Sequence, residues 1–288
     1  EHYKVNAERY LQRLILLLNK AEIPLSFRTI VKHMELDKFS ALSMQLVKEK
    51  RISKEKHLEN LEIAKTSGKI AENSIARFST MAESELGELF SDTGIDIATA
   101  LQEKAIILFI LNPLIYPELS PAFGRLVLID SKKAISQRFQ NRNRTFFLFD
   151  EINIYASKTL IDLVNKSRSA DVTCVLATQS LSDLSSAENE DFTQQIIENC
   201  NNYLVLRQNS AVNSENWANI LGTRQTMEVT YQLQQKGLDT TQTGFGSARR
   251  VREFLYHPDE IKQLQTGYGI FLSRDVYFHS KLHVNKPF

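Results

Sequence analysis

The chain has 288 residues, of which 42% are hydrophobic and 24% are charged, and its formal net charge is +1. This composition excludes a disordered or fibrous chain and is sufficient for one large or two ordinary globular domains. A charge this close to zero gives no overall field that would indicate a nucleic acid or a membrane, although a balanced total can hide a local basic patch.

Cysteine usage and hydropathy indicate in which compartment the protein works and whether it crosses a membrane. The only cysteines, Cys174 and Cys200, do not make a disulfide framework or a metal site, and they suit a reducing compartment. No apolar run approaches the ~20 residues that span a bilayer, and no secretory signal is present. We therefore expect a soluble, cytoplasmic chain. The first residue is Glu rather than Met, so we expect a piece of a longer protein.

The first part of the chain, up to about Phe90, has apolar residues at helical spacing and no β-branched run. Ser26 and Ser53 each precede such a segment and can cap a helix. The last segment contains Gly68, which could be a kink or the end of a helix. The pattern predicts four or five helices that form an all-α domain over residues 1–92.

From Ile95 onward, short apolar runs alternate with amphipathic segments. Runs that are apolar throughout are typical of parallel strands buried on both faces by helices, so residues 93–288 are predicted to be an α/β domain. The polar segment 225–254 is predicted to be a helix followed by a loop. The predicted strands are residues 105–111, 145–149, 172–179, 203–207, 269–272 and 276–279, and the predicted helices are 123–139, 160–166, 192–199 and 214–221.

An acidic pair, Asp150 and Glu151, follows the apolar run TFFLF. Ligands of open parallel sheets bind at the carboxyl ends of the strands, which is where this pair falls. Four apolar residues followed by Asp-Glu is the Walker B pattern, in which Asp150 would hold the magnesium ion and Glu151 would orient or activate the attacking water. The alternative is a helix start, because acidic residues favour helix N-termini.

The next predicted strand ends in Thr178-Gln179-Ser180. If the two strands are neighbours, Gln179 lies at the same edge of the sheet as the acidic pair. Its amide can donate to phosphate oxygens and accept from water, which suits a sensor of the γ-phosphate. A polar cluster at a strand end also forms ordinary loops.

A cation, Arg168, stands at the end of the helix that follows the acidic pair. It could simply complement the negative end of the helix dipole. It could also be an arginine finger that stabilises the transition state in the nucleotide site of a neighbouring subunit. Spacing alone favours the first interpretation.

No phosphate-binding loop of the form G-x-x-x-x-G-K-[ST] occurs in the sequence. The nearest segment, Thr66-Ser67-Gly68-Lys69-Ile70, lacks the first glycine, ends in Ile and lies in helical sequence. Gly244-Phe245-Gly246-Ser247 lacks the following lysine. Neither is a phosphate cradle.

Taken together, these motifs resemble the TraD/TraG coupling proteins of conjugation and type IV secretion, hexameric DNA-pumping ATPases related to the FtsK and HerA motors. The resemblance covers most of residues 105–272. It rests on the order and spacing of FFLFDE, the helix end at 167–170, ATQS at 177–180, YLVLRQ at 203–208, the turn at 220–222 and YHPDEI at 256–261.

The resemblance implies a RecA-like P-loop NTPase fold, of which this chain holds the portion downstream of the phosphate loop. In that family an all-α domain is inserted between the Walker A and Walker B halves, which would place residues up to about Phe90 in the insert. It also implies roles for three catalytic residues, Glu151, Gln179 and Arg168, with Arg207 a weaker alternative arginine. Asp150 and Thr178 would bind the cofactors, ATP and Mg²⁺, with Asp150 on the metal.

The implied partners are DNA, relaxase or relaxosome proteins, components of a type IV secretion channel and further copies in a homo-hexamer. The chain would be part of the cytoplasmic domain of an inner-membrane-associated protein, with an N-terminal anchor absent from this sequence. Alone, it would show no measurable ATPase activity, because the missing cradle supplies most phosphate contacts.

A rival hypothesis is a non-enzymatic module that binds DNA or a protein through its helical half. Acidic residues are interspersed among the basic ones there, so a salt-bridged surface is the alternative to phosphate contacts. A segregation or repair motor of the same superfamily is a third hypothesis. The basic residues are Lys32, His33, Lys38, Lys48, Lys50, Arg51, Lys54 and Lys56, and the acidic ones are Glu35, Asp37, Glu49, Glu55 and Glu59.

Overall fold

The computed structural model describes the chain except for residues 1, 85–86, 88–93, 138–143, 237–238 and 286–288. The chain divides into two compact units, residues 1–120 and 121–288. Each has a cluster of buried apolar side chains of its own. The predicted boundary between residues 92 and 93 lies outside the described residues and stays a prediction.

The first unit is helical. The two predicted caps form: the Ser26 hydroxyl accepts from the Thr29 amide at 3.0 Å, and Ser53 accepts from Lys56 at 3.2 Å. One long helix continues through Gly68, so no helix ends there. The helices are α1 (His2–Lys20), α2 (Phe27–Met34), α3 (Leu36–Lys48), α4 (Lys54–Glu83) and the short α5 (Ile97–Gln102).

Aromatic and aliphatic side chains from the first four helices form the core of this unit. Tyr10 packs on Phe39 with a ring-centroid distance of 4.8 Å, and its hydroxyl donates to the Met34 carbonyl at 2.7 Å. A buried phenol needs such a partner because an unsatisfied hydroxyl in a core is costly. The interior faces of α1, α2 and α3 are thereby fixed against one another.

The second unit alternates helices and strands, and the α/β class with a helical N-terminal part is confirmed. Its elements are α6 (Leu119–Ser136), β1 (Thr145–Phe149), η2 (Ile152–Tyr155), α7 (Lys158–Ser167), η3 (Arg168–Ala170), β2 (Val172–Leu176), α8 (Leu181–Ala187), α9 (Glu190–Asn199), β3 (Asn202–Leu206), α10 (Ala211–Leu221), β4 (Thr223–Lys236), β5 (Asp239–Phe254), α11 (Pro258–Lys262), β6 (Tyr268–Ser273) and β7 (Phe278–His283).

Strands β1 and β2 pair in parallel, from Thr145 opposite Val172 to Phe149 opposite Leu176. The connection between them is the α7–η3 segment, as expected because parallel strands need a crossover. The carboxyl ends of both strands therefore lie at one edge of this two-stranded sheet, and their amino ends lie at the other.

The prediction of strands buried on both faces is wrong for this pair. Phe146 and Leu148 on β1 are 61% and 77% exposed, whereas alternate residues are half-buried. Residues 105–111, predicted as a strand, form no strand, and Ile106 is 99% exposed. An apolar run becomes a strand only where a neighbouring strand offers its hydrogen-bonding groups, and no described strand pairs with this segment.

The remaining part of the sheet prediction also needs correction. β3, β6 and β7 form a separate three-stranded sheet in which both pairings are antiparallel. Short loops and turns connect β6 to β7, and a tight connection of this length can join only antiparallel strands. One face of the sheet packs against α10 and α11 in the core of this unit.

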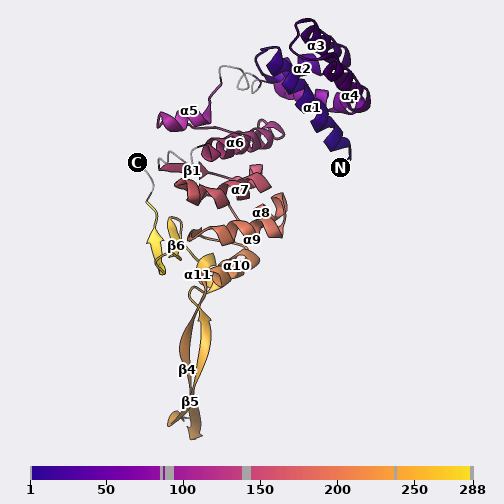
Figure 1. The fold of residues 1–288 in the computed structure, drawn as a ribbon. Helices are drawn as coiled ribbons and strands as arrows, with labels where there is room; N and C mark the ends of the chain where they lie inside the picture. The colour runs from indigo at the N-terminus through magenta and orange to yellow at the C-terminus, as the bar shows by residue number, and fades with distance from the viewer. Residues whose placement is uncertain (1, 85–86, 88–93, 138–143, 237–238, 286–288) are drawn as a thin grey trace. The chain divides into compact units, whose positions relative to one another are not determined.

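The segment 225–254, predicted as a helix and a loop, is instead a β-ribbon made of β4 and β5. Met227, Val229 and Tyr231 stand at every second position, the period of a strand, but Gln225 occupies the preceding position of this series and obscures it. None of the side chains described in the ribbon is buried. The ribbon extends away from α10 and α11 (Figure 1).

We expect Gly124 in α6 to be required for close packing. A β-carbon at this position would lie 2.8 Å from Cβ and 2.9 Å from Cγ of Tyr155. Gly124→Ala should therefore lower the free energy of unfolding by about 1–3 kcal/mol in urea titration, the usual cost of overpacking. A helical glycine with free space would instead gain ~1 kcal/mol as alanine, so a stabilised variant would contradict this contact.

Candidate active site

The acidic pair lies directly after β1, at the carboxyl edge of the β1–β2 sheet. The chain turns sharply there: Glu151 has φ 47° and ψ 51°, in the left-handed region that non-glycine residues rarely adopt. The turn is held by backbone hydrogen bonds, in which the Ala177 amide donates to Phe149 at 2.8 Å and the Ile152 amide donates to Ala177 at 3.1 Å. Such strain persists where surrounding bonds enforce it and is common at functional sites.

The predicted meeting of the acidic pair and the strand-end glutamine occurs. The side-chain amide of Gln179 donates to a carboxylate oxygen of Glu151 at 3.0 Å, across 28 positions in sequence. Gln179 is exposed and Glu151 is half-buried, so both groups remain within reach of solvent or a ligand. The structure thus brings Asp150, Glu151 and Gln179 to one edge, while their chemical roles stay predictions.

Thr178 precedes Gln179 in sequence, but its hydroxyl makes no hydrogen bond with the acidic pair among the described residues. Its hydroxyl donates to the Ser180 carbonyl at 3.2 Å, and the Ser180 hydroxyl caps α8 by accepting from the Asp183 amide at 3.1 Å. The ordinary loop interpretation therefore accounts for Thr178 and Ser180. It does not account for Gln179, whose only hydrogen bond within the described chain is to Glu151.

Tyr155 is a site residue that the sequence analysis missed. Its hydroxyl donates to the Asp150 carbonyl at 2.8 Å, which ties η2 back to the strand end. Burial, reinforced by the Asp150 and Glu151 carboxylates, raises the pKa of Tyr155 to about 12. The phenol is therefore a permanent donor at neutral pH. An aromatic residue five positions after the aspartate was the available signal.

Two further polar atoms lie buried in the same turn. Asn153 Oδ1 and Ser157 Oγ have no hydrogen-bond partner among the residues that the structure describes. Unsatisfied buried acceptors are uncommon in folded proteins. Backbone hydrogen bonds hold the chain around the acidic pair, whereas the side-chain oxygens of Asn153 and Ser157 have no partner and can still accept a hydrogen bond.

Arg168 is not brought to this edge. It lies in η3, just before β2 begins, at the amino edge of the sheet. Five strand residues at ~3.3 Å each separate the two edges by roughly 16 Å. Arg168 is exposed, and its guanidinium makes no hydrogen bond or ion pair with any described residue. Arg168 is therefore not near the acidic pair of its own chain, and Arg207 follows β3 in the other sheet.

The donor set at the carboxyl edge fits a magnesium ion. Asp150 is exposed and presents carboxylate oxygens, the ligands that Mg²⁺ prefers, and Mg²⁺ usually keeps several waters beside one or two carboxylates. One Asp150 oxygen accepts from the Glu151 amide at 3.0 Å, which orients the carboxylate. The described residues hold no cluster of three or more His, Cys, Asp or Glu side chains, so a more complete protein cage is not offered there.

The fold and this edge define a class: an α/β chain whose acidic pair and strand-end glutamine meet beside a left-handed turn. The family described as the type IV secretion-system coupling protein DNA-binding domain matches residues 63–283. This range is more than half of the chain, which therefore belongs to that family. No curated protein sequence matches the chain.

Solved structures of similar fold come from the bacterial conjugative coupling protein TrwB. The unbound form of TrwBdeltaN70 has a TM-score of 0.68 and 16% identity, and the alignment covers 100% of this chain and 64% of that chain. The complex with the GTP analogue GDPNP has a TM-score of 0.69, 16% identity and coverages of 100% and 65%. The complex with ADP and Mg²⁺ has a TM-score of 0.65, 17% identity and coverages of 100% and 64%.

These similarities establish the fold, and the chain spans less than two thirds of the length of the structures it matches. Among the described residues, no helix combines the length and the apolar character needed to cross a membrane.

We expect the buried phenol of Tyr155 to make stability depend on alkaline pH. Its pKa is raised in the folded state, so its contribution is complete below pH ~10 and is lost as pH rises toward about 12, by up to about 3 kcal/mol. Urea titrations at either end of this window should show a smaller loss for Tyr155→Phe than for the unmodified chain. Burial also raises the pKa of Tyr203 and Tyr256, which are present in both proteins and contribute equally to both losses of stability. An equal loss of stability in the two proteins would therefore show that the pKa of Tyr155 is not raised.

Proposed function

We propose that the chain is the downstream part of an ATP-driven DNA translocase that delivers relaxase-bound DNA to a type IV secretion channel. One observation carries this proposal: Gln179 donates to Glu151 at the edge where the Asp150 carboxylate also lies. Family membership and the nucleotide complexes of TrwB support it. The whole protein's activity needs parts that this chain does not contain, since no phosphate loop occurs in its sequence.

In the proposed mechanism, the left-handed turn delivers two carboxylates with separate tasks. Asp150 would hold Mg²⁺, which would supply positive charge to neutralise the transferred phosphoryl group. Glu151 orients the attacking water and accepts its proton, and Gln179 holds Glu151 in place at 3.0 Å until a γ-phosphate competes for its amide. Thr178, bonded to the chain at Ser180, is a weaker candidate for nucleotide contact.

The exposed apolar face of the β1–β2 sheet supports a larger assembly. Phe146, Leu148 and Val175 are 61%, 77% and 46% exposed on this face. A contiguous apolar surface on a globular protein marks a site that another surface covers. We propose that further elements of the longer protein cover this face and add the phosphate cradle.

The proposal also includes specific partners of the longer protein. They are a relaxase or relaxosome, the secretion channel and further copies in a homo-hexamer, with the longer protein associated with the inner membrane. Arg168 at the amino edge is compatible only with action on a neighbouring subunit's nucleotide, because its own site is at the opposite edge. The rival interpretation as a binding module leaves the Glu151–Gln179 contact unexplained.

We expect Glu151→Gln, in the longer protein that includes a phosphate loop, to abolish ATP turnover while nucleotide binding is retained. The amide keeps the size of the carboxylate but cannot accept a proton from water. Steady-state hydrolysis and fluorescent-nucleotide titration measure the two properties. Glu215→Gln, an exposed carboxylate on α10, is the matched control and should keep both. Normal turnover in Glu151→Gln would remove this residue from the mechanism.

Action of Arg168 in trans predicts complementation between variants. Arg168→Ala and Glu151→Gln hexamers should each be inactive, whereas mixed hexamers should recover part of the turnover. At some interfaces an intact Glu151 then meets an intact Arg168 from its neighbour. Arg125→Ala, an exposed arginine on α6, controls for loss of charge. Mixtures as inactive as either parent would contradict a role between subunits.

A further inference from the structure

The helical unit carries an open hollow of about 710 Å³ where the end of α1, the end of α3 and the start of α4 meet. Six of its nine lining residues are basic, and the other three are Val47, Ile52 and Ser53. The basic residues are Lys20, Lys48, Lys50, Arg51, Lys54 and Lys56. The hollow lies within residues 1–120 and is separate from the edge of the β1–β2 sheet.

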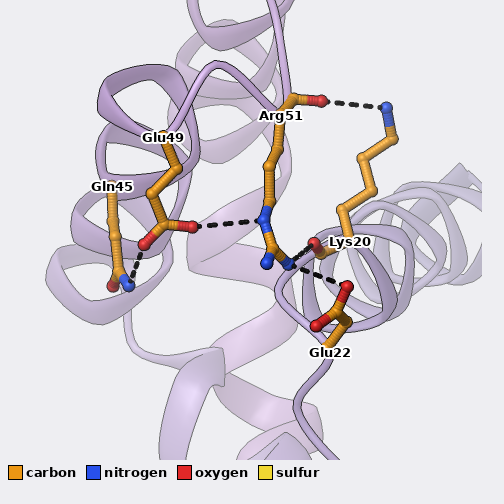
Figure 2. A network of polar contacts seen from close by, with 5 residues as sticks. All are labelled: Lys20, Glu22, Gln45, Glu49 and Arg51. Carbon is orange, nitrogen blue, oxygen red and sulfur yellow. Dashed lines mark hydrogen bonds and ion pairs between the residues drawn. The ribbon is translucent and has the colours of Figure 1, made fainter.

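Arg51 gives this hollow a fixed frame. Its guanidinium donates to the Lys20 carbonyl at 2.6 Å and lies 3.5 Å from the Glu22 carboxylate and 3.4 Å from the Glu49 carboxylate. Lys20 in turn reaches the Arg51 carbonyl at 3.5 Å. Figure 2 shows these side chains joining the end of α1 to the loop between α3 and α4. The neighbouring acidic groups are therefore occupied by the frame.

Three of the lysines are left without such partners. Lys56 pairs with Glu59 at 2.6 Å, whereas Lys48, Lys50 and Lys54 form no ion pair within the described part of the chain. All three are exposed. Glu35, Glu49 and Glu59 thus pair with other cations of the unit, and a salt-bridged surface explains only part of the basic cluster.

Local preferences disfavour two of these lysines. Lys50 has φ 59° at the end of α3, where its amide donates to Val47 and the Arg51 amide donates to Leu46, a turn that normally takes glycine. Lys54 is the first residue of α4, where the helix dipole disfavours a cation. Only Lys48, in the last turn of α3, has an ordinary dipole explanation. Residues that break local rules without local compensation are candidates for function.

We propose that this hollow binds the phosphate backbone of DNA through Lys48, Lys50 and Lys54. The inference deepens the proposed function by placing a DNA contact of the chain on its helical unit. Ammonium groups on flexible stems contact phosphates as point charges, so the binding is independent of base sequence. The contact uses the lysine side chains and not the backbone amides at the start of α4, where the Ser53 hydroxyl already accepts from the Lys56 amide at 3.2 Å.

DNA fits this surface better than an anionic membrane does. The two apolar lining residues are recessed, with Val47 half-buried and Ile52 only 8% exposed, so the hollow offers nothing to insert among lipid chains.

The test is a salt titration of DNA affinity with the triple variant Lys48→Gln/Lys50→Gln/Lys54→Gln in the full chain. Each lost phosphate contact makes the log–log slope for duplex DNA shallower by ~0.9, so three contacts amount to ~40-fold between ~50 and ~200 mM salt. We expect the triple variant to lose this salt-dependent part of its affinity, measured by fluorescence anisotropy with one labelled duplex of arbitrary sequence.

The matched control is Lys32→Gln/Lys65→Gln/Lys104→Gln. These lysines are also exposed, belong to the same unit and do not line the hollow. Lys104 has φ 57°, so each triple variant changes one left-handed lysine and removes three positive charges. Circular dichroism and thermal unfolding of both variants show whether the helical unit remains folded.

Each outcome decides the inference. A shallower slope in the first variant but not in the control supports it. Equal slopes in the two folded variants would contradict DNA binding by the hollow. They would not bear on the proposed nucleotide site of the α/β unit, because that site is tested by turnover. A first variant that loses binding to phosphatidylglycerol-containing vesicles but keeps its DNA affinity would identify a membrane contact instead and overturn the inference. If the unmodified chain does not bind DNA, both the DNA contact at the hollow and the DNA contact in the proposed function are contradicted.

Discussion

The parallel pairing of β1 and β2 is the constraint on which the candidate site depends. Its register sets Phe149 opposite Leu176, so the residues that follow the two strands emerge at one edge. No local preference could bring Glu151 and Gln179 within 3.0 Å, because 28 positions separate them in sequence. The strand pairing also keeps Arg168 at the far edge, roughly 16 Å from the acidic pair.

The rigidity of this edge comes from backbone bonds and from one buried phenol. The left-handed conformation of Glu151 would relax in an unsupported loop. The Ile152 amide and the Tyr155 hydroxyl hold the turn from either side, and Gly124 allows α6 to approach the Tyr155 ring closely enough to bury it. In the helical unit, Arg51 likewise supports a candidate site. It joins the end of α1 to the loop after α3 and occupies the Glu22 and Glu49 carboxylates, so nearby lysines stay unpaired. Both candidate sites therefore rest on a support that binds no ligand itself.

Sequence patterns identified what depends on neighbouring residues and missed what depends on distant ones. Ser26 and Ser53 were recognised as caps because a cap needs only the next three residues. The ends of β1 and β2 were recognised because polar residues follow each apolar run. The segment 105–111 is at least as apolar as β1 yet forms no strand, because pairing is not encoded in the run itself. The ribbon of β4 and β5 was missed because glutamine hid a period of two, and Tyr155 because its partner is a backbone carbonyl.

The most direct test of the account is hydrogen exchange of the longer protein, followed by mass spectrometry with and without a non-hydrolysable ATP analogue and Mg²⁺. The account predicts that peptides covering residues 149–152 and 177–180 gain protection together, because one nucleotide contacts both strand ends. Residues 166–170 should gain protection only in the assembled oligomer. Protection at neither strand end, in a protein shown to bind the analogue, would contradict the claim that the edge bearing Glu151 and Gln179 is the nucleotide site.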